Sequence, residues 1–235
     1  MLDHINKHKV LFLDVETVPQ FPDYAQVPEQ TRKLWDHKCE RIKQQETDTP
    51  ETLYERAGIY AEFGKIVCIS VGFFYKNNFR VTSFAGKDEI KILQAFSAML
   101  MKSYFRNDTL LCAHNGKEFD FPYIARRMLV NGIKLPALLN LAGKKPWEIP
   151  HLDTMELWRF GDYKSYTSLE LLASIFGIPT PKDDIKGQDV AKVFWQHDDL
   201  ERIRKYCEKD VVTIARLFVC YSGQAFFADE TIEFV

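Results

Sequence analysis

Two carboxylates lie two residues apart in the first apolar segment of the chain. The segment covers residues 10–18 and contains Asp14 and Glu16. Because the side chains of a β-strand alternate between its two faces, both carboxylates project from the face that also bears Phe12. One interpretation is the solvent-facing side of an edge strand. The apolar run at 10–13 instead favours a central strand, where adjacent anions require compensation by a divalent cation such as Mg²⁺ or Mn²⁺.

A third carboxylate falls on the apolar face of the last predicted helix, at about residues 200–221. Steps of four and three align Asp210 with Ile203, Cys207, Ile214, Leu217 and Tyr221. Tyr206 lies one turn before Asp210, on the same side of the helix. A surface carboxylate beside the stripe is one alternative. An aspartate directed at the body of an α/β fold is unfavourable unless it is paired or bound to metal, so Asp210 is a candidate metal ligand.

A fourth carboxylate, Asp120, follows the predicted strand at 109–114. Asp120 and the proline at position 122 are typical of a helix start, so capping alone could explain this aspartate. Asn115 and Gly116 could form an ordinary turn. However, the carboxyl ends of strands in open α/β sheets are where binding sites usually form. Asp120 therefore stays a candidate.

The three segments together resemble the DEDD exonucleases of the ribonuclease H-like superfamily, especially the proofreading domain of family B DNA polymerases. Three motifs are matched in order: aspartate-x-glutamate by Asp14 and Glu16, asparagine-x₃-phenylalanine-aspartate by Asn115, Phe119 and Asp120, and tyrosine-x₃-aspartate by Tyr206 and Asp210. The histidine subclass of this family has a histidine five residues before the last aspartate. This chain has Lys205 there, so the resemblance indicates the tyrosine subclass, DEDDy.

The resemblance implies a 3′–5′ exonuclease that releases nucleoside 5′-monophosphates with two divalent metal ions, Mg²⁺ or Mn²⁺. It implies that Asp14 binds both ions, that Glu16 and Asp210 bind the ion nearer the attacking water, and that Asp120 supports the second. Two ions about 3.5–4 Å apart lower the pKa of the water and neutralise charge on the phosphate. Tyr206 would orient the water, since a tyrosine with an ordinary pKa of about 10 is a poor base at neutral pH.

Weaker candidates surround these motifs. Asn115, Phe119 and Tyr123 are predicted substrate contacts, the two rings by stacking on a terminal base, although core packing explains Phe119 equally well. Candidate phosphate contacts are Arg126, Arg127, Lys144, Lys145, Lys164 and Lys186. His151 and Asp153 share a strand face, but a core histidine and a strand-end aspartate are favoured over metal ligands. His114 is at most a supporting residue.

The order of elements predicts an α/β fold with a ribonuclease H-like, mixed five-stranded sheet and helices on both faces. Three strands open the fold at 9–18, 64–74 and 79–84, and two more follow at 109–114 and 149–155. Helices are predicted from residue 88 and at 121–130, 168–176, 190–196 and 200–221. We expect residues 1–235 to form one exonuclease domain.

An insertion at about residues 19–63 separates the first two strands, and it is far longer than a hairpin loop. It contains a predicted helix from Glu29 to Gln45, whose stripe of Trp35, Cys39 and Ile42 should dock on the body of the domain. Because the insertion directly follows the strand with the paired carboxylates, we expect it to lie beside the catalytic cleft. It would then restrict entry to single-stranded ends.

Composition narrows the class of protein. The chain has 235 residues, a formal net charge of −2 and five scattered cysteines without a C-x-x-C pair. This pattern predicts neither a disulfide framework nor a thiolate zinc site. We see no signal peptide or membrane-spanning segment, and we expect a cytoplasmic protein. A protein with this net charge lacks the strongly positive electrostatic field of proteins that coat long duplexes. A local basic patch and bound metal ions nevertheless suffice to hold the end of a nucleic-acid strand.

The substrate is left open by the sequence. The resemblance to polymerases favours single-stranded DNA with a free 3′ end, while an RNA-trimming exonuclease uses the same metal chemistry. A non-catalytic nucleic-acid-binding relative is disfavoured, because all the motif residues are present. We expect no membrane partner. Since no polymerase domain is recognisable in this chain, a polymerase or repair partner would act in trans, and the oligomeric state is not predicted.

Overall fold

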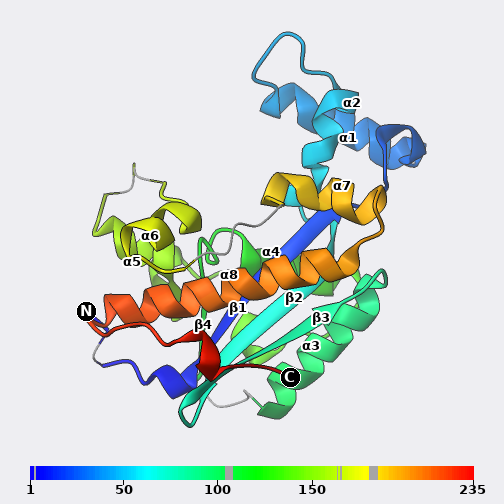
Figure 1. Ribbon diagram of the computed structural model, residues 1–235. Helices are drawn as coiled ribbons and strands as arrows, with labels where there is room; N and C mark the ends of the chain where they lie inside the picture. Colours follow the sequence, from blue (N-terminus) through cyan, green and yellow to red (C-terminus); the bar gives the residue numbers. More distant parts are fainter. Residues whose placement is uncertain (3, 104–107, 163, 165, 180–184) are drawn as a thin grey trace.

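The computed structural model describes residues 1–2, 4–103, 108–162, 164, 166–179 and 185–235. Within them, six strands form one sheet in the order β5-β4-β1-β2-β3-β6 (Figure 1). The strands are β1 (Val10–Pro19), β2 (Gly64–Tyr75), β3 (Asn78–Ala85), β4 (Leu110–Ala113), β5 (Leu152–Asp153) and β6 (Ile232–Phe234). β1, β2 and β3 are antiparallel, whereas β4, β5 and β6 each join in parallel. The predicted mixed α/β sheet is confirmed.

The prediction of five strands is wrong by one. β6 adds a sixth strand, in which Ile232 pairs with Phe79 and Phe234 with Val81. A three-residue strand is too short to show a periodic pattern in the sequence, and its existence depends on the free edge of β3. The fifth strand is shorter than the predicted 149–155, because helix α5 (Thr154–Arg159) begins directly after Asp153.

Helices cover both faces of the sheet, as predicted (Figure 1). Leu11 and Leu13 of β1 pack with α3 (Glu89–Ser103) and α4 (Asp120–Val130). Phe12 faces the other way and packs against α8 (Leu200–Tyr221), whose bounds agree with the sequence prediction. The alternation along β1 therefore decides which face each carboxylate occupies.

The remaining elements are short. Two further helices are α6 (Leu169–Ile175) and α7 (Val190–Trp195). Short 3₁₀ helices are η1 (Lys7–Lys9), η2 (Tyr24–Gln26), η3 (Tyr54–Ile59), η4 (Ala137–Leu139), η5 (Pro146–Glu148), η6 (Gly187–Asp189) and η7 (Asp229–Thr231). Among the helices that the structure describes, none has both the length and the apolar character needed to cross a bilayer.

The insertion forms a lobe that projects from the sheet (Figure 1). It contains α1 (Glu29–Ile42), which ends three residues before the predicted Gln45, and α2 (Pro50–Leu53). The expectation that the stripe of α1 docks on the body is wrong. Trp35, Cys39 and Ile42 pack with other residues of the lobe, namely Phe21, Tyr24, Val27, Leu53, Tyr54, Ala57, Tyr60 and Phe63. The lobe thus has its own small core.

The base of the lobe is fastened to the body by close contacts. A side chain at Gly58 would lie 2.9 Å from the carbonyl carbon of Val18, so only glycine permits this approach. The Tyr123 hydroxyl donates to the carbonyl of Gly58 at 2.7 Å. Arg127 Nη1 donates to the carbonyl of Ala61 at 2.9 Å. β1 and α4 therefore hold the lobe in place.

Arg127 also forms a buried ion pair with Glu89 of α3. Nε and Nη2 of Arg127 donate to the two carboxylate oxygens at 2.9 and 2.6 Å, and the residues are 5% and 8% exposed. Glu89 accepts a further bond from the backbone N–H of Ile66. The expectation that Arg127 contacts phosphate is therefore wrong, because its guanidinium is buried and used inside the protein.

We predict that Arg127→Met lowers the free energy of unfolding by about 3–5 kcal/mol, because it leaves the Glu89 carboxylate buried without its cation. Urea unfolding measures the loss. Arg126→Met is the matched control, since Arg126 is exposed on the same helix and should change stability little. Equal losses for the two variants would contradict a structural role for the buried pair.

Candidate active site

Asp14 and Glu16 lie on the face of β1 that is covered by α8. The Cys207 thiol of α8 donates to the backbone carbonyl of Asp14 at 3.4 Å. One carboxylate oxygen each of Asp14 and Glu16 and the Cys207 sulfur lie within 4.8 Å of one another. Glu16 is 7% exposed, and the pairing of β1 with β2 shifts register directly after it. The two carboxylates predicted to share a face therefore meet beneath α8.

Asp120 joins this cluster from α4. It is 3% exposed and is the first residue of the helix, while the N-cap position is held by Phe119 without a side-chain cap bond. The Asp120 carboxylate accepts hydrogen bonds from its own backbone N–H and from that of Val15 in β1. The pairing of β1 with β4 ends at Phe12. Beyond this point, Asp120 forms a hydrogen bond with the backbone of β1 at Val15. This contact directs the carboxylate towards β1.

Tyr206 and Asp210 complete the group from α8. The Tyr206 hydroxyl donates to the Asp210 carboxylate, as their spacing of one turn allows. The negative charge of Asp210 helps to raise the pKa of Asp14, Glu16 and Asp120. The four carboxylates named from the sequence are thus close enough to interact electrostatically.

Burial and mutual repulsion disfavour the charged forms of these groups. Burial is the larger cause that raises the pKa of Asp14 and Glu16 well above ordinary values, and the neighbouring carboxylates add to it. Burial likewise raises the pKa of Asp120 to about 8. The pKa of Tyr206 is raised by burial and then by Asp210 and Glu16, so its hydroxyl keeps its proton at neutral pH.

One oxygen of the cluster has no hydrogen-bond partner. Asp14 Oδ2 is buried and unpaired among the residues that the structure describes. A buried carboxylate oxygen without a partner is unfavourable in an apo protein, and a hard divalent cation removes both this penalty and the repulsion between the acids. The carboxylate donor set therefore fits Mg²⁺ or Mn²⁺.

The loop that leads to Asp120 has an unusual backbone. Asn115 adopts a left-handed conformation with φ of 63°, and a side chain at Gly116 would lie 2.4 Å from the Cβ of Ala113. The Asn115 amide donates from Nδ2 to the Tyr166 hydroxyl at 2.5 Å, while its Oδ1 is buried and has no hydrogen-bond partner in the described part of the chain. The loop is therefore held in one tight shape at the edge of the cluster.

Asp153 fastens this loop, a role that the sequence analysis missed. Its carboxylate, in a residue 3% exposed, accepts from the backbone N–H groups of Asn115 and Lys117 at 3.0 and 3.1 Å. It also caps α5 by accepting from Met155 and Glu156. The only signal in the sequence was an aspartate at a strand end, because the loop that it holds lies 38 residues away.

The two nearby histidines have satisfied ring nitrogens. His114 contacts the Thr154 hydroxyl and the Thr167 carbonyl at 2.8 and 2.9 Å. His151 accepts from the Leu111 N–H at 3.2 Å and contacts the carbonyl of Leu138 at 2.7 Å. Burial lowers the pKa of both rings. The interpretation of His151 as a core histidine is confirmed.

The predicted aromatic contacts differ in exposure. Phe119 is partly exposed and packs on Tyr123 with ring centroids 5.3 Å apart. Tyr123 is 2% exposed, and its hydroxyl donates to the carbonyl of Gly58. The ring is therefore used in packing and has no exposed face on which a base could stack. The other basic candidates are exposed: Arg126, Lys144, Lys145, Lys164 and Lys186.

Cys207 is a second residue that the sequence analysis did not place in the site. The helical pattern explained it as a member of the apolar stripe, and it is indeed buried. Only the packing of α8 across β1 brings its sulfur beside the oxygens of Asp14 and Glu16.

Comparison with known proteins adds three findings. A sequence profile of the RNase H superfamily matches residues 54–221, which include Asp120, Tyr206 and Asp210 but not β1. A DNA polymerase from Pyrococcus horikoshii is 26% identical over 199 residues, which are 77% of this chain and 15% of the polymerase. The structure of the family B DNA polymerase from the hyperthermophilic archaeon Pyrobaculum calidifontis overlaps with a TM-score of 0.47 and 15% identity, covering 88% of this chain and 24% of that one.

We predict that the chelated protein loses thermal stability as pH rises from about 4 to about 8, the window that the raised pKa of Asp120 sets. A carboxyl whose pKa is higher in the folded than in the unfolded protein favours folding below its unfolded pKa and loses that contribution as pH rises through the folded pKa. For Asp120 this window runs from 3.8 to about 8. Melting temperatures with chelator and with Mn²⁺ test the idea.

Mn²⁺ should raise the melting temperature most at the alkaline end, where the carboxylates are ionised. Asp14→Asn removes one of the carboxyl groups whose pKa is raised, so it should weaken the dependence of the melting temperature on pH in the chelated protein. A melting temperature that rises with pH under chelation, or does not respond to Mn²⁺, would show that the cluster is not a metal site.

Proposed function

Since the chain belongs to the RNase H superfamily, we propose that it is a metal-dependent 3′–5′ exonuclease that acts on single-stranded nucleic acid. The observation that carries this proposal is the electrostatic interaction of Asp14 and Glu16 with Asp120 and Asp210, together with the buried Oδ2 of Asp14, which has no hydrogen-bond partner among the described residues. Similarity in sequence to a DNA polymerase supports nucleic acid as the substrate. The chain spans only 15% of that polymerase, so its own activity is inferred from the site.

The four carboxylates would hold two divalent ions. When bound, the ions supply an activated water and neutralise the charge that develops on the phosphate and on the departing 3′ oxygen. The protein contributes the arrangement of ligands: β1 supplies Asp14 and Glu16 on one face, and the contact with the Val15 N–H aims Asp120 at the same place. Packing on both faces of β1 keeps these ligands in position.

Tyr206 would position the attacking water. Its raised pKa keeps the hydroxyl protonated, so it acts as a hydrogen-bond partner and not as a base. In the structure this hydroxyl donates to Asp210. Tyr206 as a residue is partly exposed.

DNA is the favoured substrate, and RNA is the alternative with the same chemistry. Asn115 and Phe119 border the cluster and are partly exposed, so both remain candidates for contact with the terminal nucleotide. The lobe adjoins β1 at Val18, two residues after Glu16. We therefore propose that a duplex end is a poorer substrate than a single strand, and that a polymerase or repair protein would supply substrate in trans.

We predict that the protein shortens 5′-labelled single-stranded DNA from its 3′ end in the presence of Mn²⁺ or Mg²⁺, and that chelator abolishes this. Labelled RNA of the same sequence and a blunt DNA duplex are run beside it to separate the substrate classes. Asp14→Ala should be folded and inactive, whereas Asp162→Ala, at an exposed aspartate, should keep full activity. Turnover by Asp14→Ala, or turnover in excess chelator, rules out the proposed chemistry.

A sharper prediction concerns Tyr206. Tyr206→Phe keeps the ring and its packing while deleting one hydrogen bond, so it should slow the chemical step by about 10- to 100-fold, roughly 1–3 kcal/mol. Asp210→Ala should be slower still, because it removes a metal ligand. Single-turnover rates at saturating Mn²⁺ measure both variants. A Tyr206→Phe rate equal to that of the unmodified protein would leave Tyr206 as a packing residue only.

A further inference from the structure

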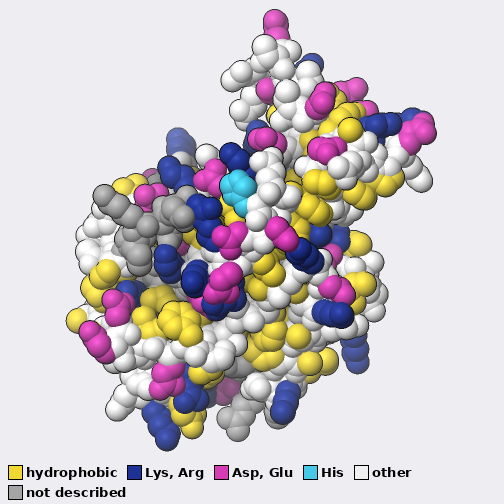
Figure 2. Space-filling view, turned by 45° about the vertical axis from the view of Figure 1, so that its right-hand side comes forward, with side chains coloured by type: hydrophobic (Ala, Val, Ile, Leu, Met, Phe, Trp, Pro, Cys, Tyr) yellow, Lys and Arg dark blue, Asp and Glu magenta, His cyan; other side chains and the backbone are white. Residues whose placement is uncertain are grey.

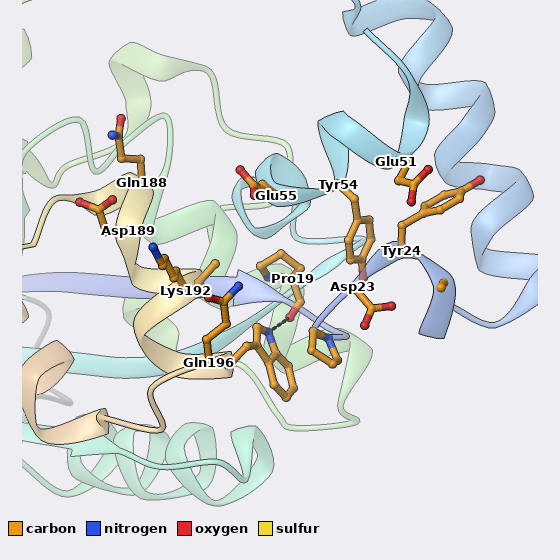
Figure 3. Close-up of a pocket in the computed structure, with 14 residues that line it drawn as sticks. Pro19, Asp23, Tyr24, Glu51, Tyr54, Glu55, Gln188, Asp189, Lys192 and Gln196 are labelled. Atoms are coloured by element: carbon orange, nitrogen blue, oxygen red, sulfur yellow. Dashed lines mark hydrogen bonds between the residues drawn. The ribbon is translucent and has the colours of Figure 1, made fainter.

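A cleft of about 670 Å³ separates the lobe from α7 (Figure 3). We call it the lobe–α7 cleft. Its lobe side is formed by Pro22, Asp23, Tyr24, Ala25, Glu51, Tyr54 and Glu55, and its other side by Gln188, Asp189, Ala191, Lys192, Trp195 and Gln196, with Pro19 between them. Nothing in the proposed nuclease chemistry uses these residues.

The walls of the cleft are fixed before any ligand binds. The Trp195 indole N–H donates to the carbonyl of Pro19 at 3.1 Å, which ties α7 to the end of β1 (Figure 3). On the lobe side, the Tyr54 hydroxyl accepts from the backbone N–H of Phe21 at 3.3 Å, and the Tyr24 hydroxyl donates to Asp36 at 2.6 Å. A cleft with preset walls loses little conformational entropy when it binds a ligand.

The charge of the lining selects against nucleic acid. Four carboxylates line the cleft, from Asp23, Glu51, Glu55 and Asp189, against the single ammonium group of Lys192. Asp23, Glu51 and Glu55 are exposed residues of the lobe, on which Figure 2 shows acidic, basic and apolar side chains. Carboxylates at this density repel a phosphate backbone and attract a cationic ligand.

Five of the other nine lining residues carry rings, and the remaining four are two alanines and two glutamines. The rings belong to Pro19, Pro22, Tyr24, Tyr54 and Trp195. Aromatic grooves receive extended, proline-containing segments of protein chains. Two of these rings already have a cation of the chain beside them, since Arg32 lies 5.8 Å from the Tyr24 centroid and Lys65 lies 4.5 Å from that of Trp195. Acidic edges around aromatic walls therefore fit a basic peptide and not a nucleotide.

We propose that the lobe–α7 cleft is a docking site for an extended, basic, proline-containing segment of a partner protein. Pro19 lies three residues after Glu16 on β1, about 10 Å along the strand at roughly 3.3 Å per residue. A partner held there would stand beside the carboxylate cluster, at the place where it could deliver or receive a nucleic acid end. The docking itself does not require nuclease activity, so it can be tested separately.

The probe is a short fluorescent peptide of alternating lysine and proline, measured by fluorescence anisotropy with the full chain in chelator. A glutamate–proline peptide of equal length and an oligothymidylate serve as competitors of opposite charge. The lysine–proline peptide should bind about tenfold or more tightly than the glutamate–proline peptide. It should also shift the indole N–H resonance of Trp195, which Trp195→Phe identifies.

Charge reversal locates the binding site. Glu51→Lys combined with Glu55→Lys should weaken peptide binding by about tenfold or more, while Glu46→Lys, on an exposed residue of the same lobe outside the lining, should not. Nuclease activity of the double variant on single-stranded DNA should be unchanged. The proposal is overturned if the peptide does not bind, if the Glu51/Glu55 double variant and Glu46→Lys bind it equally well, or if oligothymidylate displaces the peptide.

Discussion

The repulsion among four neighbouring carboxylates, of which Glu16 and Asp120 are buried, is the constraint around which the rest of the structure is arranged. Burial raises the pKa of Asp14 and Glu16, and each neighbouring acid raises it further. Holding such groups together requires a framework whose packing offsets their mutual repulsion. β1 supplies this framework, because apolar clusters pack on both of its faces. Asp14 and Glu16 lie in the part of β1 that follows its pairing with β4.

The same constraint explains the loop between β4 and α4. Asp120 reaches the cluster only because the chain turns sharply at Asn115 and Gly116, in a shape that few sequences adopt. Asp153 stabilises that shape through two backbone N–H groups of the loop, and it simultaneously starts α5. One buried carboxylate outside the cluster thus sets the position of another inside it.

The lobe is stabilised independently of the carboxylate cluster. Its own core contains Trp35, and its base is held by Tyr123 and Arg127, two residues whose types suit contact with nucleic acid but whose side chains are buried. These contacts join the lobe to β1 and α4, and the lobe meets β1 at Val18, two residues after Glu16. Under the two proposals, the acidic lining of the lobe–α7 cleft would separate the surface for a cationic partner from the surface for a polyanionic substrate.

The sequence by itself determined what depends on local periodicity and residue type. The alternation along β1 placed Asp14 and Glu16 on one face, the pattern of α8 defined the helix Leu200–Tyr221, and the spacing of Tyr206 and Asp210 placed them together. Only the tertiary structure decided the features that need distant partners. β6 exists because β3 offers an edge, Arg127 is buried because Glu89 faces it, and Asp153 and Cys207 enter the site because loops and helices meet there. Periodicity reports which face of an element is apolar, but it does not report which other element covers that face.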